Sequence, residues 1–252
     1  MKDFFANIIE FSSPSTQNRV CNNYDVLKFI AIFTMVIDHI GSYFFQDIEI
    51  FREIGRIAFP IFLFLVGYSE KFEPRYNLLF YGIIITIAHN SLIKFQQADI
   101  LISIFLSCLV MKYLKNKNYL DIKYFNEILI STIIWSFFTS FIFAYGTIAF
   151  MFAIAGYFFK TQPENNKVKL FLFISIFFNL LNYYVFSSTP KTSLNTIFIV
   201  LIGYITYFLL SNFRLSEVNF IGKDLIKSVS QNALFIYIFH KLLFILMAYY
   251  AR

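Results

Sequence analysis

The chain has 252 residues, of which 58% are hydrophobic, 21% aromatic and only 14% charged. A soluble domain carries about 25% charged residues, so this composition excludes an ordinary soluble globular protein and indicates a polytopic membrane protein. The formal net charge of +6 fits cytoplasmic loops that face anionic lipid, and no nucleic-acid partner is predicted.

Residues 1–24 are polar and mixed in charge. They lack the compact apolar run and small-residue cleavage site of a signal peptide, so we expect a polar cytoplasmic N-terminal tail. Residues 25–252 are predicted to form a single transmembrane helical domain. Cys21 and Cys108 suggest no disulfide framework and are expected to be free thiols.

Apolar runs of about 17–25 residues predict membrane-spanning helices. The fold class predicted is therefore all-α, a polytopic integral membrane helix bundle with about nine transmembrane helices. The predicted spans are 26–46, 53–69, 77–94, 98–113, 127–143, 145–160, 168–187, 193–211 and 232–250. Tight helix hairpins are expected at residues 96–99 and 144–146.

The Lys and Arg residues of the loops test this count. With nine spans and a cytoplasmic N-terminus, each inner connection holds more Lys and Arg than its outer neighbours. The positive-inside bias requires this alternation. Odd-numbered spans then run outward and even-numbered spans run inward.

The first span carries three ionisable residues, Lys28, Asp38 and His39. Such groups cost roughly 2.5–3.5 kcal/mol at the centre of a membrane helix and usually face the bundle interior. Eleven helical steps make three turns plus about 20°, so Lys28 and His39 share a face roughly 16 Å apart along the axis. Adjacent residues point about 100° apart, so we expect Asp38 to pair with Arg56 of the second span while His39 faces a cavity. Two alternatives remain: Lys28 as a snorkelling lipid anchor, and Asp38–Arg56 as a purely structural ion pair.

Other polar residues fall at related depths. Pro60 is expected to kink the second span. His89 and Asn90 in the third span match the depth of Asp38, His39 and Arg56, and His240 and Lys241 of the ninth span fall below them. The alternative for His89 and for His240–Lys241 is helix packing through hydrogen bonds. The three histidines lie on three spans without local ligand spacing, so no metal site is predicted.

The segments Leu27–Gly41 and Ile54–Phe62 closely resemble the TraX family, whose namesake N-acetylates pilin. Weaker similarity continues at Ala144-Tyr145-Gly146 and at Phe235–Leu242, where Phe239 replaces the usual proline and Lys241 intervenes before Leu242. The Lys28-x10-His39 spacing also resembles the basic-x10-His signature of the wider transmembrane acyltransferase group. In that group, the resemblance implies, the histidine is catalytic and acyl-coenzyme A arrives from the cytoplasm.

The resemblance thus implies a membrane-embedded acyltransferase of the bacterial cytoplasmic (inner) membrane. It would move an acetyl or longer acyl group from acyl-coenzyme A, with acetyl-CoA as co-substrate, to an amine or hydroxyl. The acceptor would be a pilin-like peptide N-terminus, a glycan or a lipid. The expected roles are catalysis by His39, Asp38 and Arg56, binding of coenzyme A phosphates by Lys28 and Arg75, and a supporting part for His89, Asn90, His240 and Lys241.

Two other functional classes remain open. A proton- or anion-coupled transporter or flippase would use Asp38, His39 and Arg56 as its coupling site. The first span lacks the Gly/Pro interruption typical of transporter sites, which disfavours this class. A non-catalytic assembly factor that keeps the fold is the third alternative.

Overall fold

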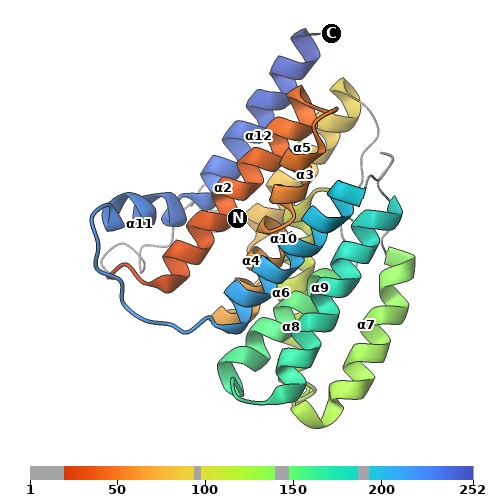
Figure 1. The fold of residues 1–252 in the computed structure, drawn as a ribbon, viewed down its shortest axis with the longest axis vertical. Coiled ribbons are helices and arrows are strands. Elements are labelled where there is room, and N and C mark those ends of the chain that lie inside the picture. The colour runs from red at the N-terminus through yellow and green to blue at the C-terminus, as the bar shows by residue number, and fades with distance from the viewer. Residues whose placement is uncertain (1–19, 94–97, 140–147, 187–192, 252) are drawn as a thin grey trace, which may run out of the picture. The chain divides into compact units, whose positions relative to one another are not determined.

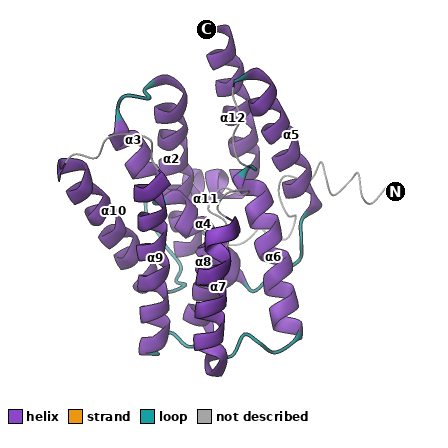
Figure 2. Ribbon diagram, turned by 90° about the vertical axis from the view of Figure 1, so that its right-hand side faces the viewer, coloured by secondary structure: helices purple, strands orange, loops and turns teal. Residues whose placement is uncertain are grey.

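A computed structural model describes residues 20–93, 98–139, 148–186 and 193–251, and every regular element among them is a helix (Figure 2). The predicted all-α class is confirmed. Three helices are long and apolar enough to cross a membrane, namely Asn23–Phe44, Asn166–Val185 and Ala233–Tyr250. The protein is therefore a membrane protein.

The described residues form two compact units. The first contains α2 (Asn23–Phe44), α3 (Glu49–Gly55), α5 (Tyr76–Leu92), α11 (Lys223–Gln231) and α12 (Ala233–Tyr250). The second contains α4 (Ala58–Ser69) from Pro60 onward, α6 (Ile100–Asn116), η2 (Ile122–Tyr124), α7 (Phe125–Thr139), α8 (Ile148–Thr161), α9 (Asn166–Phe186) and α10 (Ser193–Ser211). The single domain predicted for residues 25–252 stays a prediction.

Most predicted spans lie close to a helix, with α2, α5 and α12 near the first, third and ninth. The short helix α11 was not predicted. Residues 1–19 of the predicted tail and most of the two predicted hairpin turns, at 94–97 and 140–147, lie outside the described residues.

The predicted second span, 53–69, is wrong as a single helix. The chain instead breaks between α3 and α4, where the N–H of Arg56 donates to Glu53 O (3.0 Å) and the N–H of Ile57 donates to Ile54 O (3.2 Å). These short-range bonds make a turn. Pro60 then falls in the first turn of α4, where its missing N–H leaves no helix bond unmade, so the expected mid-span proline kink is also wrong.

The start of α2 is fixed by a capping box. The Asn22 side chain accepts from the backbone N–H groups of Tyr24 and Asp25, and the Asp25 carboxylate accepts from the N–H of Asn22. Asp25 is fully buried, and its other oxygen accepts a 2.7 Å hydrogen bond from Ser230 Oγ at the end of α11. The beginning of α2 is thus joined to the α11–α12 corner.

Helices α2 and α12 lie side by side and run in the same direction (Figure 1). Ser230 meets Asp25 at one end of the pair, and the ring of Phe244 lies 6.1 Å from that of Tyr43 near the other. Tyr43 also lies 5.9 Å from His89, close to the C-terminal end of α5. The C-terminal halves of α2, α5 and α12 therefore meet.

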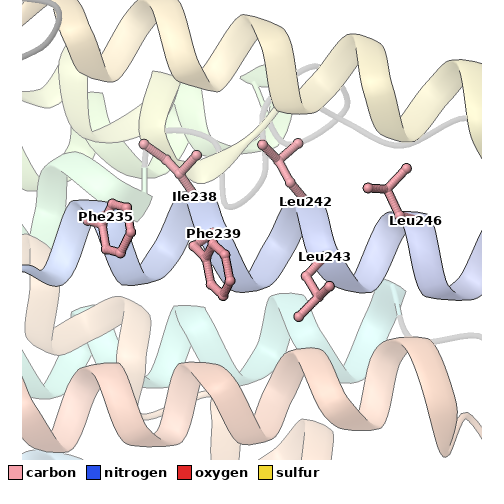
Figure 3. A pocket seen from close by; sticks show the side chains of 6 residues that line it. All are labelled: Phe235, Ile238, Phe239, Leu242, Leu243 and Leu246. Atoms are coloured by element: carbon pink, nitrogen blue, oxygen red, sulfur yellow. The ribbon is translucent and has the colours of Figure 1, made fainter.

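Helix α12 has two chemically different faces. One is an apolar groove of about 290 Å³ lined by Phe235, Ile238, Phe239, Leu242, Leu243 and Leu246 (Figure 3). At about 100° per residue, Tyr237, His240 and Lys241 lie on the opposite side of the helix. All three are buried. The apolar face suits lipid, and the opposite face carries the polar groups into the unit.

The second unit is built around α8, whose residues from Ile148 to Phe159 are almost all buried. It crosses α4 with the two backbones in contact. A Cβ on Gly67 would lie 1.7 Å from the carbonyl oxygen of Ala153, and one on Gly156 would lie 2.0 Å from that of Phe64. Small residues allow this close approach between membrane helices.

Gly156→Ala and Gly67→Ala should each lower the thermal midpoint of the detergent-purified protein. Overpacking against a backbone that cannot move aside costs about 1–3 kcal/mol. Gly203→Ala is the matched control, because its new Cβ would first meet the flexible end of the Leu180 side chain at 2.5 Å. Equal midpoints for all three variants would show that the α4–α8 contact is not tight.

The C-terminal ends of α4, α6 and α8 meet in one ion-pair cluster. Glu70, which follows α4, lies 3.4 Å from Lys115 of α6 and 3.2 Å from Lys160 of α8. Burial by itself raises the pKa of Glu70, but hydrogen bonding and positive charge from Lys160 and Lys115 outweigh it and hold the pKa below its usual value. These three helices therefore end on the same side of the second unit.

Candidate functional site

Two histidines from opposite ends of the chain form the centre of the site. His39 Nδ1 of α2 lies 2.7 Å from His240 Nε2 of α12, within hydrogen-bond distance. Their ring centroids lie 4.9 Å apart, and the ring planes are inclined by 26°. Both side chains are buried. His39, predicted to be catalytic, and His240, predicted to have a supporting part, are therefore in direct contact.

Aromatic rings surround this pair. Tyr237 stands edge-on to His39 at 5.7 Å and to His240 at 5.8 Å, and Tyr43 stands edge-on to His39 at 6.4 Å. The far side of Tyr43 contacts His89, which is buried as well. Tyr43 thus lies between His39 and His89, which were predicted at similar depth, and His240, which was predicted below them, contacts His39 directly.

A buried cation adjoins the histidines. Lys241 Nζ donates a 3.1 Å hydrogen bond to Tyr237 Oη and lies 5.4 Å from the centre of the Tyr237 ring. Only 5% of Lys241 is exposed, which excludes a snorkelling position for its ammonium group. Lys241 therefore belongs to the polar interior around the histidine pair.

The predicted Asp38–Arg56 ion pair is wrong. Asp38 Oδ2 instead accepts a 2.8 Å charge-assisted bond from Arg52 Nη1 of α3. The reason is the separate helix α3, which follows the turn after Phe44 and lies back along the end of α2. A Cβ on Gly55 would lie 2.2 Å from Asp38 Cβ, so only glycine allows this approach.

The remaining predicted residues lie further along the same helices. Lys28 is half-buried near the start of the continuous helix α2, roughly 16 Å from His39 along the axis. Arg75 occupies the exposed position before α5, at the opposite end of that helix from His89. Asn90 is exposed, unlike its neighbour His89. The described contacts bring together His39, His240, Lys241 and His89, and do not show Arg56, Arg75 or Asn90 beside them.

Sequence reasoning missed four residues of this region: Tyr43, Arg52, Glu53 and Tyr237. Glu53 is a carboxylate only 2% exposed in α3. The polar pair Gln46-Asp47 indicated that the first span ends before α3, but it did not indicate that a separate short helix follows. Nothing in the residue pattern indicated which aromatic side chains would contact the histidines.

Within the described ranges, no group of three or more His, Cys, Asp or Glu side chains is arranged to hold a metal ion. Cys21 and Cys108 are both buried free thiols, as expected.

Comparison with known proteins identifies the family. A family model described as TraX protein matches residues 23–247. The chain belongs to the TraX family. A relative from Rickettsia prowazekii (strain Madrid E), the uncharacterized protein RP591, is 32% identical over 228 residues, covering 88% of this chain and 90% of the relative. No solved structure matches. The TraX match includes α2, α3, α5 and most of α12. It therefore includes His39, Tyr43, His89, Tyr237, His240 and Lys241.

Proposed function

We propose that this TraX-family protein is a membrane-embedded acyltransferase that moves an acetyl or longer acyl group from acyl-coenzyme A to an amine or hydroxyl. The observation that carries the proposal is the state of His39. It is buried in an apolar helix bundle, its Nδ1 bonds His240, and its Nε2 has no hydrogen-bond partner among the described residues. An imidazole nitrogen left open in this way is suited to general base catalysis.

The donor would be bound along α2. Coenzyme A carries phosphates, and Lys28 stands at the end of α2 where Asp25 and the α11–α12 corner lie. Lysine is an effective partner for phosphate as a point charge. Arg75, at the start of α5, is the second candidate for this contact. The extended pantetheine arm has a reach comparable to the separation of Lys28 and His39, so it would bring the thioester to His39.

In the transfer, the acceptor amine or hydroxyl would attack the thioester carbonyl while His39 Nε2 takes its proton. The C–N or C–O bond forms, the C–S bond breaks, and the proton passes from His39 to the departing coenzyme A thiolate. Lys241, which adjoins the histidine pair, is the cation proposed to stabilise the negative charge that develops on the carbonyl oxygen. Asp38 is proposed to hold α3 in place through Arg52.

The topology of about nine spans with a cytoplasmic N-terminus belongs to this proposal. Parallel α2 and α12 support an odd number of crossings between the first and last helix, and nine is odd. The shared end of α4, α6 and α8 supports the second, fourth and sixth spans running in one direction. The bacterial cytoplasmic membrane is the proposed location, because only there does the inner face meet acyl-coenzyme A.

The test is acetyl-CoA binding and hydrolysis by the detergent-purified protein. Wild type should bind acetyl-CoA saturably and turn it over slowly, and Lys28→Ala should weaken binding because one phosphate contact is lost. Lys227→Ala, a cation at the same end of the first unit, is the matched control for loss of charge alone. If wild type neither binds nor hydrolyses acetyl-CoA, the acyltransferase proposal fails. Proton-dependent uptake by reconstituted vesicles would then favour a transporter.

A further inference from the structure

His240 makes two hydrogen bonds through its two ring nitrogens. Its Nδ1 contacts the backbone carbonyl oxygen of Ile236, four residues earlier in α12, and its Nε2 contacts His39 Nδ1 at 2.7 Å. A carbonyl oxygen only accepts hydrogen bonds, so Nδ1 of His240 carries a proton. In neutral imidazole the other nitrogen is then an acceptor.

This arrangement determines the proton positions on His39 as well. Because Nε2 of neutral His240 accepts, His39 Nδ1 must be the donor of the 2.7 Å bond. Neutral His39 then carries its single proton on Nδ1 and has its lone pair on Nε2. No other arrangement of protons in the neutral pair satisfies both hydrogen bonds.

The surroundings keep both rings in this orientation. The two imidazoles meet edge to edge with their planes inclined by only 26°, and Tyr237 packs edge-on against both. The other side of His240 meets the edge of the Phe244 ring at 5.5 Å. A flip of either ring would break a buried hydrogen bond, which is costly.

We propose that His240 is a positioning residue that holds His39 as the Nδ1–H tautomer and so keeps Nε2 of His39 available for proton transfer. In many enzymes a carboxylate orients the histidine base. Here the neutral imidazole of His240 orients His39, and His240 Nδ1 in turn donates to the backbone carbonyl oxygen of Ile236. The pair is then uncharged at rest, which suits its burial next to the ammonium group of Lys241. The claim that His39 Nε2 takes part in proton transfer rests on the proposed acyl transfer. The claim that His39 is the Nδ1–H tautomer does not.

Nitrogen-15 NMR of histidine-labelled protein in detergent tests the tautomer directly. The chain has only three histidines, so His39→Gln, His89→Gln and His240→Gln assign every signal. In wild type we expect protonated Nδ1 and unprotonated Nε2 on both His39 and His240. A protonated Nε2 on neutral His39 would overturn the proposal.

Two substitutions of His240 separate its hydrogen bond from its bulk. His240→Phe keeps the ring but removes the acceptor, so His39 should become a mixture of tautomers and turnover should fall about 10–100-fold with acetyl-CoA binding unchanged. His240→Gln offers its side-chain oxygen to His39 Nδ1 and should restore both the single tautomer and most of the turnover. Phe239→Leu, on the opposite groove face of α12, controls for disturbance of the helix.

The outcomes distinguish the two proposals. The expected tautomer in a wild-type protein without turnover would contradict acyl transfer and leave the positioning of His39 intact. Turnover that His240→Phe does not change would contradict the catalytic role of His240 even if acyl transfer is confirmed.

Discussion

Replacement of His39 by alanine should lower acetyl-CoA turnover by about 10²–10⁴-fold, the contribution of a positioned acid–base group. The loss follows from the removal of Nε2, the ring atom with no hydrogen-bond partner in the described part of the chain. Binding of acetyl-CoA should persist, because Lys28 lies roughly three turns away on the same helix. Turnover is measured by release of the free thiol, and binding by equilibrium titration.

Two controls make the His39→Ala result specific. Met35→Leu alters a buried residue one turn earlier on α2 while conserving volume, and should keep turnover. Free imidazole should restore part of the activity of His39→Ala by entering the vacated space. A His39→Ala protein with wild-type turnover and an unchanged thermal midpoint would exclude His39 from the chemistry.

The second large effect concerns the ion pair that joins α2 to α3. Arg52→Ala should strongly destabilise the protein, because it leaves the carboxylate of Asp38, whose side chain is only 15% exposed, without its partner. Breaking a buried pair costs about 3–5 kcal/mol, and Arg52 is itself about one-third exposed, so we expect a value below that range.

Double-mutant cycles compare the coupling energy of Asp38 and Arg52 with that of Asp38 and Arg56. Asp38→Ala combined with Arg52→Ala should show a coupling of about 0.5–3 kcal/mol in thermal unfolding. Asp38→Ala combined with Arg56→Ala should be nearly additive, because the contact of Asp38 is with Arg52. Stronger coupling to Arg56 would restore the pairing expected from the spans alone.

Features of this fold that depend on neighbouring residues in the sequence were predictable, and contacts between residues far apart in the sequence were not. The boundaries of α2 and α12 follow from apolar run length, a local property that sequence displays directly. The depth of His39, His89 and His240 also follows, once the spans are counted. Their contact does not, because helix rotation about its axis is set by packing against neighbours.

The Asp38–Arg56 error has the same origin. Treating 53–69 as one helix put Arg56 at the depth of Asp38, and depth alone selected it as the partner. The turn at Arg56 and Ile57 depends on the close packing of Gly55 against Asp38, a tertiary contact that no apolar pattern reveals. Arg52 fell in the predicted loop between the first two spans, because α3 was not predicted as a helix of its own. Helix α11 was missed because nine residues with mixed polarity give no span signal.

The hydrogen bond between His39 and His240 joins residues 201 positions apart. At a synthesis rate of about 5–20 residues per second, His39 enters the membrane roughly 10–40 s before its partner exists. During that interval, α2 lacks the contact that His240 makes with His39. Any chain released before α12 is synthesised therefore carries a His39 without the hydrogen bond that orients its ring. Completion of the site is thus among the last events of biogenesis, and a chain truncated before residue 233 should insert yet stay inert.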